Sequence, residues 1–189
     1  MKIFGIDPGS ERTGYGCIET DGSRHCLVAC GAIVSPPSTA FPHRLLAIHA
    51  RLTALLADCR PDCAALESLF FAANVRSALT LGHARGVAML AAVEAGVPVV
   101  EYSPAEVKRA VVGYGRADKR QVQRMVALLL GLPAAPAPDD AADALAVAIC
   151  HVHSQGRAAA AGWSRPAGGR ASSWRRLEVP GSHGGRMRP

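Results

Sequence analysis

The order of strand-like and helix-like segments restricts the fold of this chain more than any other feature. Three short apolar segments come first, over 2–6, 14–18 and 26–34, with turn signals between them. Helical periodicity then alternates with two further strand-like segments. Three strands in succession, followed by alternating helices and strands, are typical of an α/β domain with a mixed sheet.

The rest of the chain reads as five helices and two strands. We expect a helix after the Pro-Pro break at 36–37, a strand over 64–66, a helix over 77–95, a strand over 97–100, and helices over 103–113, 118–131 and 139–153. Capping boxes predict the starts of two helices, at Ser103 and at Asp118. Asp139 is expected to be the N-cap of the last helix.

Composition places most of the chain in one domain. The longest apolar runs are shorter than a membrane span, and Asp7 interrupts the apolar N-terminus, so we expect a cytoplasmic protein with no membrane partner. Residues 156–189 are rich in Gly, Ser, Pro and Arg without periodicity, which predicts a disordered Arg/Gly-rich tail behind a domain of residues 1–155.

The net charge of +6 suggests an anionic partner such as nucleic acid. Its distribution changes that argument. Residues 154–189 hold seven Arg and one Glu, whereas residues 1–153 have no net charge. The global charge therefore describes the tail, and the chemistry of the domain has to be found in local patterns.

Two carboxylates directly follow apolar strands, where ligands bind in open α/β sheets. Asp7 ends the first strand and Glu67 ends the strand over 64–66. Each has an ordinary explanation as well, since Asp is common in turns and a strand-end Glu is usually solvated. The two become a candidate site if their strands are neighbours.

A third acidic group opens the last helix. Asp140 and Asp143 are three residues apart and share a helix face. Asp143 stands among apolar residues, where a carboxylate is costly unless it is paired or binds a cation. Acidic groups without a His or Cys ligand set indicate Mg²⁺ or Mn²⁺. Two such ions can hydrolyse a phosphodiester.

Basic residues suited to a phosphodiester substrate concentrate between the strands and the last helix. They are Lys108, Arg109, Arg116, Lys119, Arg120 and Arg124. A solvated helix face is the commoner fate of such a cluster, but the nearby carboxylates favour phosphate contact. The pair Phe70-Phe71 follows Glu67 closely, and such a pair belongs either to the core or to a loop that stacks on bases.

These motifs together resemble the RuvC family of crossover (Holliday) junction endodeoxyribonucleases, in the RNase H-like superfamily. The matching stretches are GIDPGSERTGYG, ALESLFFAANVRSALTLGHARG, VKRAVVGYGRADKRQVQRMV and DDAADALAVAICH, in family order over about residues 1–153. The resemblance implies an RNase H-like fold with a five-stranded mixed sheet flanked by helices. It also implies a homodimer that resolves Holliday junctions in DNA recombination and repair.

The implied reaction is symmetric nicking of two opposed strands, leaving 5′-phosphate and 3′-hydroxyl ends. The implied cofactor is Mg²⁺, two ions per subunit, with Mn²⁺ as a substitute, and the implied partners are four-way junction DNA and the branch-migration proteins RuvA and RuvB. By resemblance the metal-binding carboxylates are Asp7, Glu67, Asp140 and Asp143, the active-site lysines are Lys108 and Lys119, and the junction-contacting aromatic is Phe70.

Further candidates for DNA contact are Phe71, Arg76, Arg109, Arg116 and Arg120. The helix that carries Gly82 and Gly86 lies where the resemblance places part of the dimer interface. Asp139 beside Asp140 leaves the third metal ligand open between the two. The tail after about residue 155 has no counterpart in the family pattern.

Three other readings compete. An actin-like or sugar-kinase ATPase also starts with a strand, Asp and Gly, but it needs a second such domain. A YqgF-type or other RNase H-like nuclease would share the carboxylates without the dimer helix. A catalytically inert nucleic-acid-binding module would not need all four carboxylates.

Overall fold

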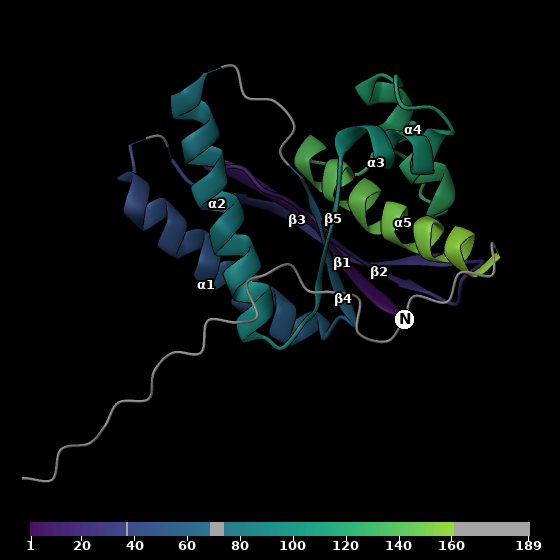
Figure 1. Cartoon of the computed structure of the whole chain (residues 1–189), viewed down its shortest axis with the longest axis horizontal. Helices are drawn as coiled ribbons and strands as arrows, with labels where there is room; N and C mark the ends of the chain where they lie inside the picture. Colours follow the sequence, from purple (N-terminus) through teal and green to yellow (C-terminus); the bar gives the residue numbers. More distant parts are fainter. Residues whose placement is uncertain (37, 69–73, 161–189) are drawn as a thin grey trace, which may run out of the picture.

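The computed structural model describes residues 1–36, 38–68 and 74–160, with side chains as far as residue 155. It confirms an α/β fold with a five-stranded mixed sheet between two layers of helices (Figure 1). The strands are β1 (Lys2–Asp7), β2 (Arg12–Thr20), β3 (His25–Val34), β4 (Cys63–Glu67) and β5 (Val99–Tyr102). The helices are α1 (Phe41–Cys59), α2 (Val75–Glu94), α3 (Pro104–Val112), α4 (Lys119–Leu129) and α5 (Asp139–Ala160).

The strand order is β3-β2-β1-β4-β5. β1, β2 and β3 pair antiparallel as a meander, whereas β4 pairs parallel with β1 and with β5. Parallel neighbours need a long crossover connection, and α1 and α2 supply the two that this sheet requires. β1 is therefore central, and its carboxyl end lies beside the carboxyl end of β4.

Alternation along the strands sends side chains to two separate cores. Phe4 and Ile6 of β1 pack with α1 and α2, whereas Ile3 packs with α3, α4 and α5. In β4, Ala64 and Leu66 face the first layer, and Cys63 and Ala65 face the second. Since strand side chains alternate with a period of two residues, the residue that ends each strand is directed toward α5.

Close contact between α5 and the sheet depends on small residues. A Cβ atom added to Gly5 would lie 2.0 Å from the carbonyl oxygen of Ala144, and one added to Gly14 would lie 2.0 Å from that of Asp140. The facing side of α5 is rich in buried alanines, at positions 141, 142, 144, 146 and 148. Glycine permits such close backbone approach, so α5 lies directly on β1 and β2.

The capping signals are confirmed. Ser103 with Glu106 and Asp118 with Gln121 form complete capping boxes, and α3 ends at Gly113 in a left-handed conformation with φ of 97°. The last strand, β5, lies two residues later than expected.

Two expectations about α5 are wrong. Asp139 is the first residue inside the helix rather than its N-cap, and its carboxylate lies 3.5 Å from the Lys119 ammonium. The helix also continues to Ala160 rather than ending near His153, so residues 156–160 are helical instead of belonging to a disordered tail. Residues 161–189 lie outside the described residues, and the expectation for them stays a prediction. Among the described helices, none has the combined length and apolar character needed to cross a bilayer.

Candidate active site

Asp7 and Glu67 are neighbours at one edge of the sheet. β1 and β4 pair in parallel with Ile6 opposite Leu66, so the carboxylate that follows each of these residues lies at the same strand ends. Both carboxylates point to the face covered by α5, because they continue the alternation that sends Ile3 and Ala65 there. The condition left open by the sequence, that the two strands be adjacent, is met.

The first turns of α5 bring two more carboxylates to this edge. Asp140 lies against Gly14: its Cβ is 3.1 Å from the position that a Gly14 Cβ would take, which is closer than ordinary van der Waals contact. Gly14 is itself paired with Asp7 in the antiparallel register of β1 and β2. Asp143, one helical turn further along, is close enough to Asp7 and Glu67 to raise the pKa of both. Three separate parts of the chain thus converge on one site.

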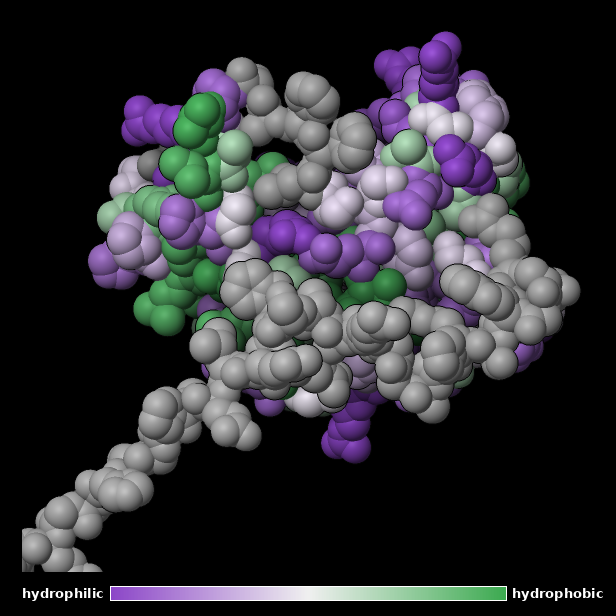
Figure 2. Space-filling model, in the orientation of Figure 1, coloured by the Kyte–Doolittle hydropathy of each residue, from purple (hydrophilic) through white to green (hydrophobic). Residues whose placement is uncertain are grey.

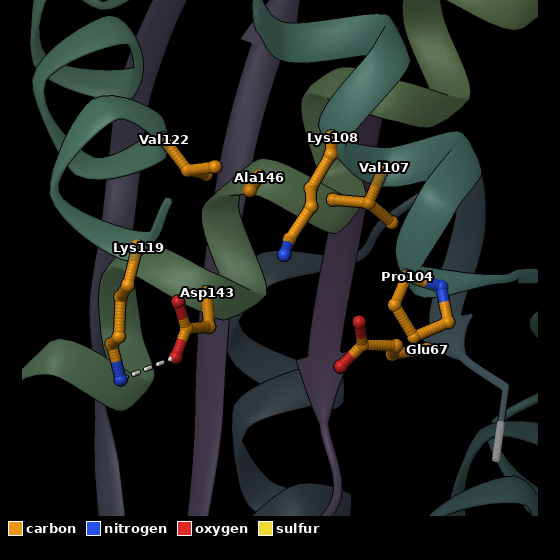
Figure 3. Close-up of a pocket in the computed structure, with 8 residues that line it drawn as sticks. All are labelled: Glu67, Pro104, Val107, Lys108, Lys119, Val122, Asp143 and Ala146. Carbon is orange, nitrogen blue, oxygen red and sulfur yellow. Dashed lines mark ion pairs between the residues drawn. The ribbon is translucent and has the colours of Figure 1, made fainter. Parts of the chain in front are cut away.

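Cationic side chains face these carboxylates. Lys119, the first residue of α4, places its Nζ 3.0 Å from Asp143 Oδ2 and 3.5 Å from Asp139 Oδ2. Lys108 of α3 lowers the pKa of Glu67 through its charge. The close-up shows the Lys108 ammonium directed into the space between Glu67 and Asp143, whereas the Lys119 ammonium pairs with Asp143 on the side away from Glu67 (Figure 3).

Arg12 belongs to the site and was missed by the sequence reasoning. Its Nε donates a 2.7 Å hydrogen bond to Asp140 Oδ2. The available signal was its position in the motif GIDPGSERTGYG, two residues before the glycine that α5 contacts. Arg12 and Asp140 are 128 positions apart, so no local pattern could pair them.

Burial and mutual repulsion perturb the carboxyl groups. Burial raises the pKa of Asp7 from 3.8 to about 7, Glu67 and Asp143 add to the rise, and Lys119 opposes it. Burial also raises the pKa of Glu67, while Lys108 and a hydrogen bond from Asp7 lower it. The pKa of Asp143 is raised by burial, against the effect of its hydrogen bond with Lys119. Like-charged groups in one site hold protons until a cation replaces them.

The site includes a pocket of about 230 Å³. Its lining residues are Glu67, Pro104, Val107, Lys108, Lys119, Val122, Asp143 and Ala146 (Figure 3). One water takes about 30 Å³ of liquid volume, so the pocket has room for a hydrated ion or for a phosphate group. Four of the lining residues are charged and four are apolar.

The donor chemistry fits a hard divalent cation. Mg²⁺ takes oxygen ligands, the acidic groups of the site offer carboxylate oxygens, and a cation would relieve the repulsion that raises their pKa values. As the side chains stand, no three His, Cys, Asp or Glu residues within the described ranges are close enough to share one ion. An ion shared by three of these carboxylates would require side-chain rotations that bring them closer together.

The remaining candidates for DNA contact fall in two places. Arg109, Arg116, Arg120 and Arg124 are exposed on α3, on α4 and on the connection between them, and Arg76 is exposed in the first turn of α2. Phe70 and Phe71 lie outside the described residues. In Figure 2, hydrophilic residues gather over α3 and α4 at the upper right.

A sequence profile described as "Crossover junction endodeoxyribonuclease RuvC" matches residues 3–151. The chain is 54% identical over 153 residues to the protein of that name from Chloroflexus aggregans, covering 81% of this chain and 93% of the relative. It is 53% identical over 153 residues to the one from Pelotomaculum thermopropionicum, with the same coverage.

A solved structure agrees with these matches. It is described as T. thermophilus RuvC in complex with Holliday junction substrate, and it superimposes with a TM-score of 0.80 at 38% identity. The superposition covers 83% of this chain and 96% of that one. Among the readings that the sequence left open, these matches select one. The chain belongs to the RuvC family of crossover junction endodeoxyribonucleases.

Proposed function

We propose that this chain is a metal-dependent resolvase that nicks two opposed strands of a Holliday junction symmetrically, leaving 5′-phosphate and 3′-hydroxyl ends. The observation that carries the proposal is the pocket lined by Glu67, Asp143, Lys108 and Lys119, with Asp7 beside Glu67 and Asp143. A relative described in complex with Holliday junction substrate supports the choice of DNA.

The proposed metal ligands are Asp7, Glu67, Asp143 and Asp140. Two Mg²⁺ ions per subunit, with Mn²⁺ as a substitute, would supply an activated water and stabilise the leaving oxygen. We assign the third ligand to Asp140 rather than Asp139, because Asp140 is the less exposed of the two and lies against Gly14 beside Asp7. Asp139 faces Lys119 at the outer rim.

The two lysines would bind and orient the phosphodiester. Lys119 lies in the first turn of α4, where backbone amides and a cation together favour a phosphate group. Lys108 approaches from α3 on the other side of the pocket (Figure 3). A strand held between the two ammonium groups would place its scissile phosphate over the carboxylates.

The basic residues of α3 and α4 would guide the DNA backbone toward this pocket. Arg109, Arg116 and Arg120 are exposed there, and contacts of this kind position DNA without reading its sequence. We assign Arg76 the same role at the start of α2. Phe70 and Phe71 remain predicted junction contacts that stack on bases or wedge between them.

Homodimerisation through α2 is supported by an exposed apolar stripe. Val75, Leu79, Leu90 and Val93 are exposed at helical spacing on this helix. A Cβ added to Gly82 or Gly86, on the same stripe, would have no described residue within 4 Å. Hydrophobic residues gather along α2 in the space-filling view (Figure 2). A second copy of the same stripe would bury it and place two sites on one junction.

Residues 1–155 with the rest of α5 would form the nuclease domain, and the segment beyond would add DNA affinity. We further propose that the dimer acts with RuvA and RuvB in the cytoplasm.

Cleavage of a synthetic four-way junction and of linear duplex, with and without Mg²⁺, tests the proposal. We expect paired nicks at symmetric positions in the junction alone, only with Mg²⁺, and resealing of the products by a ligase. Asp7→Asn serves as the control that keeps the fold without the activity. Cleavage of linear duplex at the rate of the junction would show a general nuclease rather than a resolvase. Cleavage in the presence of a chelator would exclude the metal mechanism.

A further inference from the structure

We propose that Arg12 is a positioning residue that holds Asp140 in place for the metal site and, through its free amino groups, contacts a phosphate of the junction. The inference rests on the proposed function and adds a residue to it. Arg12 is the first residue of β2, at the same end of the sheet as Asp7.

The contact between the two side chains is short and directional. Arg12 Nε donates to Asp140 Oδ2 at 2.7 Å, with side-chain exposures of 48% and 24%. Hydrogen bonds between two ionised groups are shorter and stronger than neutral ones. Within the part of the chain that the structure describes, Arg12 supplies the one guanidinium paired with a proposed metal ligand.

The backbone fixes both partners. The carbonyl oxygen of Asp140 is so close to Gly14 that no Cβ fits there, and Gly14 is held in register with Asp7. The two ends of the ion pair are therefore anchored on elements that are packed together. An exposed ion pair contributes little to stability, about 0–1 kcal/mol. Stabilisation of the fold therefore does not explain the Arg12–Asp140 pair well.

Each partner keeps unused capacity. Arginine carries five N–H donors, and among the described residues Arg12 uses only Nε in a hydrogen bond. The terminal amino groups of its half-exposed side chain can take two phosphate oxygens at once. Asp140 likewise has Oδ1 without a hydrogen-bond partner among the described residues, available to a cation. Arg12 can thus join the metal site to the DNA backbone.

The role of Arg12 matches what carboxylate ligands generally need. A hydrogen bond from a neighbouring group orients a ligating carboxylate, and loss of such a partner typically weakens metal binding about 10- to 100-fold. A phosphate contact has its own signature, because each neutralised phosphate adds about 0.9 to the slope of log K against log salt.

Both effects can be measured without turnover. Loss of metal binding is measured by titrating the metal-free full-length protein with Mn²⁺ and following the electron paramagnetic resonance of free Mn²⁺. Loss of a phosphate contact is measured from junction affinity at a series of salt concentrations, in the presence of a chelator. We expect Arg12→Gln to weaken Mn²⁺ binding at least about tenfold and to reduce the slope by about one. Arg12→Lys should keep the slope and lose Mn²⁺ affinity, because an ammonium lacks the fork that serves both partners.

Arg24→Gln is the matched control. Arg24 is exposed in the turn between β2 and β3, at the opposite end of β2 from Arg12, and both readings should stay at their wild-type values. Unchanged or tighter Mn²⁺ binding by Arg12→Gln would overturn the positioning role, and an unchanged slope would overturn the phosphate contact. Asp7→Asn tests the proposed metal site separately from the role of Arg12. If Asp7→Asn binds Mn²⁺ as the wild type does, the metal site itself is wrong, whatever Arg12 does.

Discussion

The carboxyl group of Glu67 lies close enough to that of Asp7, at the ends of two adjacent parallel strands, for its charge to raise the pKa of Asp7. Two carboxylates this close cannot both be ionised cheaply, so one of them keeps a proton near neutral pH. That proton stands where a metal cation would otherwise balance the charge. Without a metal ion, the clustered carboxyl groups therefore lower the stability of the folded protein, and this loss of stability can be measured.

Asp7→Asn should stabilise the metal-free protein at alkaline pH while abolishing cleavage. The pKa of Asp7 is about 7 in the folded protein and 3.8 in its ordinary state, so the folded state holds a proton that the unfolded chain releases. Wild-type stability therefore falls as pH rises from about 4 to about 7. Each pKa unit corresponds to about 1.4 kcal/mol. Since Asp7 is partly exposed, we expect a gain of about 1–3 kcal/mol at alkaline pH.

Urea unfolding in a chelator across this pH range measures the effect. The gain from Asp7→Asn should vanish near pH 4, where the wild-type carboxyl is already protonated, and junction binding should survive at all pH values. A wild-type protein whose stability does not fall over this range would contradict the raised pKa. Normal cleavage by Asp7→Asn would contradict the assignment of Asp7 as a metal ligand.

Asp139→Asn and Asp140→Asn should differ sharply. Asp139 is 69% exposed and pairs with Lys119, whereas Asp140 lies against the sheet and pairs with Arg12. We expect Asp140→Asn to lose Mg²⁺-dependent cleavage and Asp139→Asn to keep most of it. Rates over a range of Mg²⁺ concentrations decide between them, and the reverse order would make Asp139 the ligand.

Lys119→Ala should slow cleavage by about 10²–10³-fold, the usual cost of removing one electrostatic contact to a transition state. Its ammonium is 3.0 Å from Asp143 and faces the pocket. Junction affinity should fall only modestly, because other basic residues hold the backbone. Single-turnover rates measure the effect, and Arg120→Ala, on the next residue of α4, is the control. Turnover unchanged from wild type would make Lys119 an ordinary surface charge.

Leu79→Glu should convert the proposed dimer to a monomer. Leu79 is 60% exposed on the apolar stripe of α2, and a charge there would be buried without a partner in the proposed interface. Sedimentation equilibrium measures the change. Leu128→Glu is the matched control, since Leu128 is 73% exposed on α4, away from that stripe. If both variants have the mass of the wild type, α2 is not the dimer interface.

Removal of residues 161–189 should lower junction affinity at low salt and leave cleavage selectivity intact. Residues 161–189 hold six Arg and one Glu, and such a segment adds sequence-independent affinity that salt screens. The cut is placed after Ala160 because α5 extends that far. Binding to junction and duplex at two salt concentrations checks the prediction, and loss of junction preference by the shortened protein would refute it.

Much of the fold was predictable because its signals are local. A capping box spans four residues, and both predicted boxes are present at Ser103 and Asp118. The boundary errors have local causes as well. Asp139 follows a proline and was expected to cap α5, yet the helix begins on Asp139 itself, with Ala141 donating to the carbonyl of Pro138.

The candidate site was only partly predictable, since its carboxylates come from motifs but their arrangement does not. Asp7 and Glu67 are sixty positions apart, and their contact depends on which strand pairs with β1. The local sequence around a strand-end carboxylate does not show which strand lies beside it in the sheet. Arg12 had only its place in the GIDPGSERTGYG motif as a signal, and its partner Asp140 became evident only with α5 placed across β2.

By itself, the sequence determined the α/β class, the order of the elements, the helix starts and the family to which the chain belongs. These depend on hydrophobic periodicity, on capping bonds between near neighbours and on motifs in a given order. The tertiary structure alone decided that β1 lies next to β4, that Asp140 rather than Asp139 faces the sheet, and that Arg12 meets Asp140. Those outcomes follow from the packing of distant segments, where small residues such as Gly14 allow α5 to touch the sheet.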